Sequence, residues 1–426
     1  MSQSNTRAYL FKFRGSDYVF CKTAGHGAEC QAQIVQKVST GELLIRKVSK
    51  HRLDYMKCSD PHEFRIVQDY LSKPPLVPGL VPLIPKLYGH EKLPAKGEKF
   101  HLVSYWQLLN GGALKDLILT KFNSLKHSRY DPNVRIPARL IVRMIHQVFS
   151  SLQHMYTVNP DTPIFHRDLH ANNVWMHLPT TSNGELSAIP DFYLGDFGYA
   201  GWPYGFTTNH WATRDIEQVM FFAHLMISAN LPEAYRPPKD MKVPNPNIPN
   251  RGNIPNDAPM TAVLRMYYSF CEEINSWKLE NSRFFRKASC PPPDLMGMIR
   301  KAEALEKQLS PSLTGTLTMN MSGMDESKDP RVVQFYNEMK GRALMKVSAQ
   351  PLTMTGTVQT CLTPMVGTNP VKVHGPFYLA EKRFGKWEAI DNQTYHRPGK
   401  TRGSGRGLRA LSDSPDEDGE SDSEPE

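Results

Sequence analysis

Short runs of alternating apolar and polar residues, interrupted by glycines, dominate the first hundred residues. Between residues 18 and 48, three such runs are separated at Gly25–Gly27 and at Gly41. This pattern is typical of three successive antiparallel strands. A similar run over residues 100–106 predicts a further strand. The beginning of the chain is therefore expected to be rich in β-structure.

One helix is expected between these strands. Asp60 can cap its start, and Pro61 suits its first position. The pattern predicts that the helix extends to about Leu71. Residues 74–94 contain six prolines and are expected to be mostly loop.

The second half of the chain follows a helical period. Apolar residues recur every four positions across residues 138–156. A strand at 174–176 and the run that leads to Gly195 predict a hairpin that turns at Asn183–Gly184. Residues 215–231 are apolar on nearly all sides, which predicts a central, buried helix. Weaker patterns predict helices at about 260–288, 294–309 and 330–347, and a β-segment near 371–390.

Changes in composition predict the domain boundaries. The segments are a lead-in at 1–14, a main domain at 15–310 with a proline-rich insert at 232–259, a linker at 311–329, an appendage at 330–395, and a tail at 396–426. The tail is expected to be disordered, because a basic block is followed by eight acidic residues and no aromatic residue interrupts the basic block. It is read as a solvated tail or a nuclear-import patch, and nucleic-acid binding through stacked bases has little support.

Composition excludes several classes of protein. Of the 426 residues, 40% are hydrophobic and 22% charged, so a wholly disordered chain is excluded. The longest nearly uncharged apolar stretch, 219–231, is too short to span a membrane. The N-terminus lacks the apolar core of a secretory signal, and the six cysteines lack CxxC spacing. We therefore expect a cytoplasmic or nuclear protein with reduced thiols and no membrane contact; the oligomeric state stays open.

Three motifs carry the chemistry of this chain. His166-Arg167-Asp168 is followed at the fifth position by Asn173. The sequence Gly-Asp-Phe-Gly ends at 198, Gly25-His26-Gly27 precedes a predicted strand, and the later run Glu-Leu-Leu-Ile-Arg-Lys-Val carries Lys47. Their order resembles that of the protein-kinase superfamily. The resemblance covers about residues 15–310 and implies an α+β, bilobal protein-kinase fold. The small N-lobe (about 15–108) would be β-rich with one main helix, and the larger C-lobe (about 109–310) mostly helical.

The resemblance implies roles for the loop residues. Asp168 would act as the catalytic base that orients the acceptor hydroxyl, and Asn173 and Asp196 would hold Mg²⁺ across the ATP phosphates. Amide and carboxylate oxygens are the ligands that Mg²⁺ prefers. Arg167 would pair with a phosphorylated residue such as Thr207 or Thr208, although plain loop residues are the alternative at those positions.

Lys47 is the candidate lysine for the α- and β-phosphates of ATP, with Lys50 as a neighbouring alternative. Its expected partner is Glu63, 16 residues further on (63 − 47 = 16). Glu63 has a second interpretation, because it stands three residues after Asp60 and could complete a capping box.

The remaining nucleotide contacts follow from the same alignment. Gly25 and Gly27 would let backbone N–H groups approach the phosphates, although the third glycine of the usual pattern is Cys30 here. Ser104, Tyr105 and Trp106 would line the adenine pocket; the alternative for Trp106 is a place in the core.

Two features depart from the family pattern. His170 stands where many Ser/Thr kinases have a lysine. Asp215, which resembles the buried aspartate that braces the catalytic loop, follows Asp196 by only 19 residues (215 − 196 = 19), with no Ala-Pro-Glu motif between them.

The leading hypothesis is an ATP- and Mg²⁺-dependent kinase that phosphorylates Ser or Thr of unknown protein substrates. The alternatives are a pseudokinase that binds nucleotide or partners without turnover, and a kinase-fold enzyme that acts on a small molecule.

Overall fold

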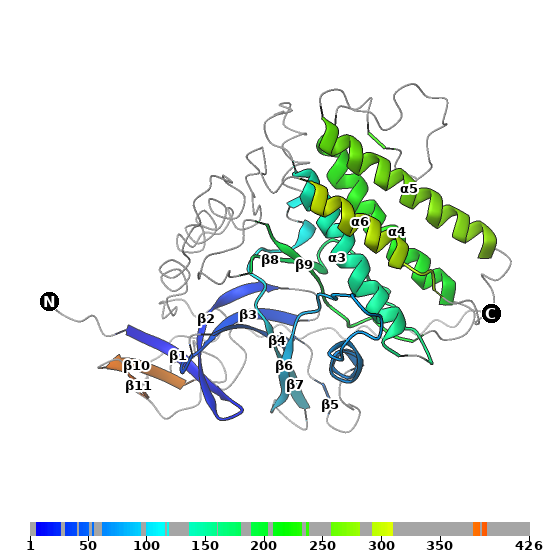
Figure 1. The fold of residues 1–426 in the computed structure, drawn as a ribbon. Helices are drawn as coiled ribbons and strands as arrows, with labels where there is room; N and C mark the ends of the chain where they lie inside the picture. The colour runs from blue at the N-terminus through cyan, green and yellow to red at the C-terminus, as the bar shows by residue number, and fades with distance from the viewer. Residues whose placement is uncertain are drawn as a thin grey trace, which may run out of the picture.

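The computed structural model has an α+β architecture in which a large sheet occupies one side of the molecule and four long helices the other (Figure 1). The structure describes residues 6–26, 30–40, 42–50, 53–54, 62–94, 99–115, 117–118, 136–159, 161–179, 189–202, 208–231, 236–237, 257–281, 292–309, 378–383 and 386–389. The expected linker 311–329, the helix at 330–347, the tail and the Asn183–Gly184 turn lie outside these residues.

The large sheet is antiparallel throughout its described pairs. Its order is β11-β10-β1-β2-β3-β4-β7-β5, and β6 pairs with β7. The strands from the first part of the chain are β1 Thr6–Phe13, β2 Ser16–His26, β3 Cys30–Lys37, β4 Leu43–Ser49, β5 Leu53–Asp54, β6 Leu87–Pro94 and β7 Lys99–Gln107. The three strands expected between residues 18 and 48 are present as β2, β3 and β4.

The sheet extends beyond the residues that the pattern assigned to it. The expectation that residues 1–14 form only a lead-in is wrong for β1, because Leu10, Phe11 and Phe13 are buried and pack the strand onto the sheet. The strand continues into β2 through a turn at Gly15, whose φ is 74°. β10 (Tyr378–Arg383) pairs with β1, and β11 (Lys386–Ala389) pairs with β10, so the described part of the β-pattern near 371–390 belongs to this same sheet.

A short helical segment lies between β5 and β6 in the chain. α1 (His62–Ile66) continues directly into one π-helical segment, η1 (Val67–Leu71), which agrees with the predicted end at about Leu71. The loop expected over 74–94 is shorter than predicted, since β6 begins at Leu87. Five of the six prolines lie before residue 86, and Pro94 is the last residue of the strand, where a missing N–H costs little.

The long helices pack around a small hairpin. They are α3 Ala138–Thr157, α4 Thr208–Ser228, α5 Ala258–Asn281 and α6 Met296–Gln308, and the hairpin joins β8 Val174–His177 to β9 Asp191–Leu194. α4 begins seven residues before the predicted start (215 − 208 = 7), which places Asp215 inside the helix rather than at its opening. Within the described chain, no helix is both long and apolar enough to cross a membrane.

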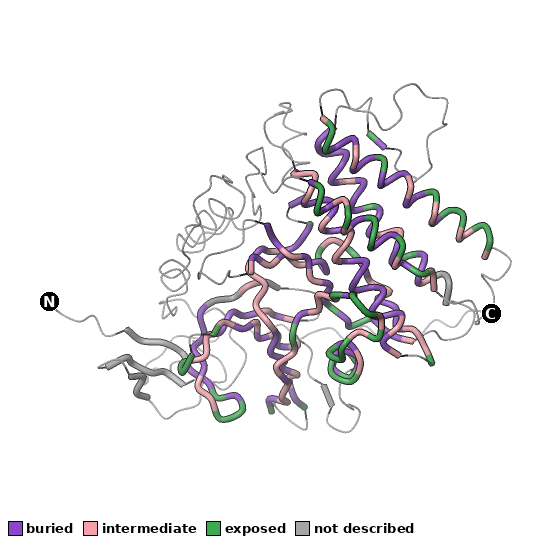
Figure 2. The backbone as a smooth tube through the Cα atoms, in the orientation of Figure 1, coloured by how far each residue is buried: buried purple, intermediate pink, exposed green. Residues whose placement is uncertain are grey.

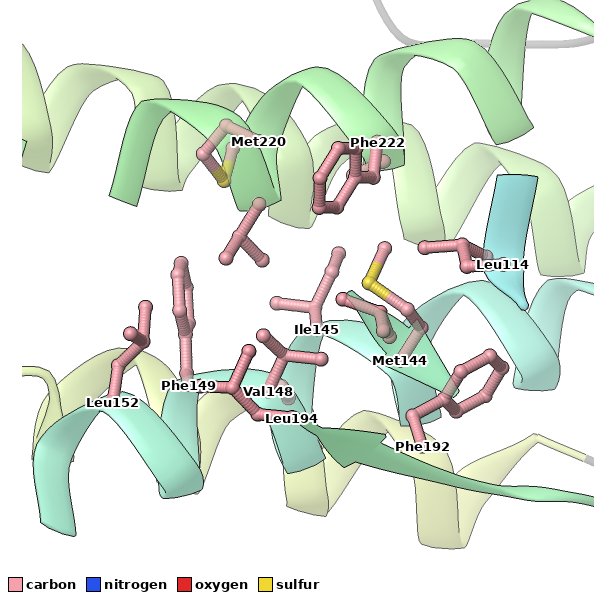
Figure 3. Close-up of a cluster of buried hydrophobic side chains, with 14 of the residues drawn as sticks. Leu114, Met144, Ile145, Val148, Phe149, Leu152, Phe192, Leu194, Met220 and Phe222 are labelled. Atoms are coloured by element: carbon pink, nitrogen blue, oxygen red, sulfur yellow. The ribbon is translucent and has the colours of Figure 1, made fainter. Parts of the chain in front are cut away.

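The main core lies where α3, α4 and the hairpin meet. Figure 3 shows Ile145 and Phe149 of α3 facing α4, beside Phe192 and Leu194 of β9. Figure 2 shows that buried positions concentrate in this central region, whereas the outer side of α5 is exposed. A buried side chain of this size contributes about 1.5–3 kcal/mol by leaving water. The core therefore holds the β8–β9 hairpin in place, which also fixes the residues just before β8 and just after β9.

Candidate functional site

The loop that contains His166 and Arg167 is held in place by hydrogen bonds to a buried aspartate. Asp215 is 0% exposed, and its carboxylate accepts hydrogen bonds from the backbone N–H of His166 (2.8 Å) and of Arg167 (3.1 Å). These bonds hold Arg167 at a φ of 66°, in the left-handed region that non-glycine residues seldom occupy. The bracing role that the sequence suggested for Asp215 thus has a direct geometric counterpart.

A neutral histidine joins this loop to the Asp-Phe-Gly segment. His166 is fully buried, and burial lowers the pKa of its imidazole to about 4. The ring is therefore uncharged at neutral pH, and Nε2–H can donate to the carbonyl of Gly195 at 3.1 Å. The backbone N–H of Gly195 in turn donates to the carbonyl of Asn173 at 2.9 Å. Two independent bonds thus fix one loop against the other.

The structure brings Asp168 and Asn173 together. The side-chain amide of Asn173 donates to the Asp168 carbonyl at 2.9 Å and lies 3.4 Å from its Oδ2. Because Nδ2 is used in this way, the acceptor oxygen of the Asn173 amide is left for other partners. His170 completes the group, with Nε2 at 3.5 Å from the Asp168 carboxylate. The Asp168 side chain is 38% exposed and therefore open to an incoming molecule.

Asp196 acts electrostatically on residues of both this loop and the sheet. It is exposed and has a φ of 64°, while the Phe197 side chain that follows is buried. Its charge acts on both Lys47 of β4 and Glu63 of α1. The structure thus gathers three sequence-predicted residues from a strand, a helix and a loop.

Burial and opposite charge compete at this cluster. Burial lowers the pKa of Lys47, but the carboxylates of Glu63 and Asp196 outweigh it, so the net pKa is raised and the ammonium stays charged. Burial and Asp196 raise the pKa of Glu63, against the opposing effects of Lys47 and the backbone N–H of Phe197. Among the described residues, Lys47 and Glu63 form no direct ion pair, and Glu63 Oε1 is buried without a hydrogen-bond partner.

Strand register decides which residues of β7 accompany Lys47. Lys47 is opposite Ser104, and its Nζ lies 5.3 Å from the centroid of the Trp106 ring. Trp106 is only 4% exposed, donates to Ser104 Oγ at 2.8 Å and belongs to the main core. The core alternative for this residue is therefore confirmed, and the face of its ring also meets the Lys47 ammonium, whereas the adenine-pocket alternative stays a prediction.

The expectation that the Tyr105 side chain lines the same pocket is wrong. Side chains alternate along a strand, so Tyr105 projects to the opposite face from Ser104 and Trp106. There its ring stacks on Phe13 with centroids 3.7 Å apart, and its hydroxyl donates to Glu91 at 2.5 Å. The Arg46 Nε also reaches this hydroxyl at 3.4 Å. Tyr105 thus stabilises an aromatic cluster with Phe11, Phe13 and Tyr18 on the face of β7 opposite Ser104 and Trp106.

The glycine-rich turn is described only in part. Gly25 lies on β2 next to a register shift and is opposite Ala32, the residue that is also opposite Lys47 on β4. Gly27 lies outside the described residues. Cys30 begins β3, and burial, together with the charges of Asp196 and Glu63, raises the pKa of its thiol against the influence of Lys47. The protein therefore holds a neutral thiol beside the charged cluster.

Arg167 has partners that the sequence did not indicate. Its Nη2 donates to the carbonyl of Trp202, and its guanidinium lies 5.6 Å from the centroid of the Trp211 ring. Thr207 lies outside the described residues, and Thr208 is the first residue of α4. The only signal in the sequence was the unusual tryptophan content of the short stretch before Asp215.

The assembled site is a cation beside oxygen donors. Lys47 supplies the positive charge, and Asp168, Asn173 and Asp196 supply carboxylate and amide oxygens. Such donors suit a hard divalent cation, which keeps several waters and is usually completed by substrate phosphates. In the described part of the chain, no three His, Cys, Asp or Glu side chains converge to hold a metal by themselves.

Comparison with known proteins adds no relative to this picture. The chain matches no protein-family model, and no curated protein matches it in sequence.

Proposed function

We propose that the chain is an ATP- and Mg²⁺-dependent protein kinase that transfers the γ-phosphate to Ser or Thr hydroxyls of protein substrates. In this proposal, residues 15–310 form a bilobal kinase fold, with strands β2–β7 of the large sheet and α1 in the N-lobe and α3–α6 in the C-lobe. The observation that carries the proposal is the connected loop pair, in which Asp168 and Asn173 are bonded to each other and the Asn173 backbone is bonded to the segment that holds Asp196.

Each residue then has a chemical task that it can perform where it stands. The Asp168 carboxylate orients the acceptor hydroxyl and receives its proton, while Lys47 binds the α- and β-phosphates. Asn173 and Asp196 would hold Mg²⁺, which neutralises charge on the transferred phosphate when it is bound. Phosphoryl transfer depends mainly on alignment and charge neutralisation, so a preformed loop pair is what this reaction needs.

The protein substrate would meet an unusual surface. Only 19 residues separate Asp196 from Asp215 (215 − 196 = 19), and residues 203–207 between them lie outside the described structure. Tyr199 is 70% exposed directly after the Asp-Phe-Gly segment, close in sequence to the reacting groups. A short segment offers less area for peptide docking, which favours a substrate bound partly by other surfaces.

The proposal is tested by phosphate transfer from γ-labelled ATP. The full chain, with Mg²⁺, is given a mixture of protein and small-molecule acceptors, beside the variants Asp168→Asn and Asp161→Asn. Asp161 is exposed in a turn before the loop, so Asp161→Asn makes the same chemical change outside the site. We expect label on Ser or Thr of protein with wild type and Asp161→Asn, and at least about a hundredfold less with Asp168→Asn. Equal transfer by wild type and Asp168→Asn would refute the proposed role of Asp168.

A pseudokinase module is the second candidate, and one observation favours it. Lys47 and Glu63 influence each other electrostatically, yet no direct ion pair joins them among the described residues. This candidate predicts that ATP raises the unfolding temperature of wild type and Asp168→Asn equally while neither protein transfers label. Label found only on a small-molecule acceptor would instead identify a kinase-fold enzyme of different specificity.

A further inference from the structure

The segment that follows Asp-Phe-Gly is inserted between α1 and the Asp168 loop. Gly201 and Phe165 exchange two backbone hydrogen bonds, both of 2.9 Å, which fasten the segment to the loop. On its other side the segment meets the start of α1. A Cβ atom at Gly201 would lie 3.2 Å from both Arg167 Nη1 and His62 Nε2. A side chain at this position would require the ends of the Arg167 and His62 side chains to move by a few tenths of an ångström, so the segment is packed closely between them.

Trp202 contacts both the α1–η1 segment and the Asp168 loop. Its ring meets the His62 imidazole edge-on, with centroids 5.2 Å apart at 69°, and the Tyr70 ring with centroids 5.5 Å apart at 76°. These geometries are the favourable edge-to-face arrangements of aromatic rings. Its carbonyl accepts the hydrogen bond from Arg167 Nη2. One residue thus contacts the beginning of α1, the η1 segment and the loop that carries Asp168.

The position of α1 matters because Glu63 lies beside His62 on the same turn. α1 and η1 together contain only ten residues (5 + 5 = 10), which is too short for a helix to hold its place by intrinsic propensity. Its placement must come from tertiary contacts. Phe64 supplies one set, with His90 at 4.6 Å and Trp106 at 6.4 Å between centroids, and these anchor the face toward the sheet. Trp202 supplies the contacts that face the loop.

We propose that Trp202 is a positioning residue that couples α1 to the Asp168 loop and so places Glu63 opposite Lys47 and Asp196 without a phosphorylated residue in the segment. The proposal rests on the proposed kinase function. Arg167 already has the Trp202 carbonyl and the Trp211 ring as partners, the latter shared with Arg214. The link between the loop and the helix is therefore formed by aromatic contacts and a backbone carbonyl. Neither depends on a phosphate group.

The test compares Trp202→Leu, Trp202→Phe and a control, Trp277→Leu, in the full chain. Trp277 is a half-buried tryptophan on α5. Hydrogen exchange is measured over residues 62–71, and transfer is measured in single turnover. We expect Trp202→Leu to speed exchange in 62–71 by about tenfold or more and to slow transfer by about 10- to 100-fold, as misplacement of about 1 Å can do. Trp202→Phe should keep hydrogen exchange over 62–71 and the transfer rate close to those of wild type, and Trp277→Leu should change neither quantity. Phosphatase treatment should leave the wild-type transfer rate unchanged.

A double variant separates positioning from a merely structural role. If Trp202 acts through Glu63, then Glu63→Gln slows transfer in wild type but adds little in Trp202→Leu, because the effects of coupled residues are not additive. Additive effects, unchanged exchange over 62–71, or phosphatase-sensitive wild-type transfer would each overturn the proposal. If wild type transfers no phosphate at all, the kinase function fails, and the exchange measurement still decides whether Trp202 holds α1.

Discussion

Replacing Asp215 with alanine should destabilise the protein more than the loss of one exposed carboxylate could. The carboxylate is fully buried and accepts two backbone hydrogen bonds, at 2.8 and 3.1 Å. Asp215→Ala leaves the N–H groups of His166 and Arg167 without these acceptors. Each orphaned buried donor costs about 1–3 kcal/mol, so the gross loss is about 2–6 kcal/mol.

Part of this loss is offset, because the variant no longer buries a carboxylate. Burial raises the pKa of Asp215 to about 7 from its ordinary value of 3.8, which shows that the site disfavours the charge. We therefore expect a net loss of about 2–4 kcal/mol for Asp215→Ala, and about half of that for Asp215→Asn, which keeps one acceptor oxygen. Arg167 would also relax from its φ of 66°, so the loop geometry should suffer along with the stability.

Urea denaturation of the three proteins measures these differences, with Asp294→Ala as the matched control. Asp294 is exposed and accepts one backbone hydrogen bond, from Met296 at 2.9 Å, so its removal should cost about 1 kcal/mol or less. A lower denaturation midpoint with an unchanged m-value identifies a change in stability. If Asp215→Ala unfolds at the same urea concentration as wild type, the two bonds do not stabilise the loop and the reasoning fails.

Two further predictions concern a tight contact and a titration. Gly111→Ala should cost about 1–3 kcal/mol by overpacking, because its Cβ would lie 2.8 Å from Met176 Cβ, whereas Gly297→Ala, with no atom within 4 Å, should be neutral or stabilising; thermal unfolding of both checks this. Between about pH 4 and pH 7 the Asp215 contribution to stability should fall as the pH rises, since the unfolded carboxyl loses its proton near 3.8 and the folded one near 7. The stability advantage of wild type over Asp215→Asn should therefore shrink from about pH 5 to about pH 7, and an advantage that grows over this range would contradict the assignment.

The local patterns of the chain were enough to predict most elements of the fold and to single out residues that the structure brings together. Helical period identified α3, α5 and α6, and glycine-separated runs identified β2, β3 and β4. Motif order identified Asp168, Asn173 and Asp196, which the structure places on two bonded loops. Such elements and motifs can be predicted because neighbours along the chain determine periodicity, caps and turns, and because a short motif keeps its spacing wherever it lies.

The tertiary structure alone decided the contacts between distant segments. Strand register placed Tyr105 on the outer face and Trp106 beside Lys47, although the two are adjacent in sequence. Pairing of β10 with β1, and of β11 with β10, brought these two strands onto the sheet from the far end of the chain. The insertion of Trp202 between α1 and Arg167 joins three segments whose separations carry no sequence signal. Such contacts depend on how buried faces fit together, and that fit is a property of the packed chain rather than of any local pattern.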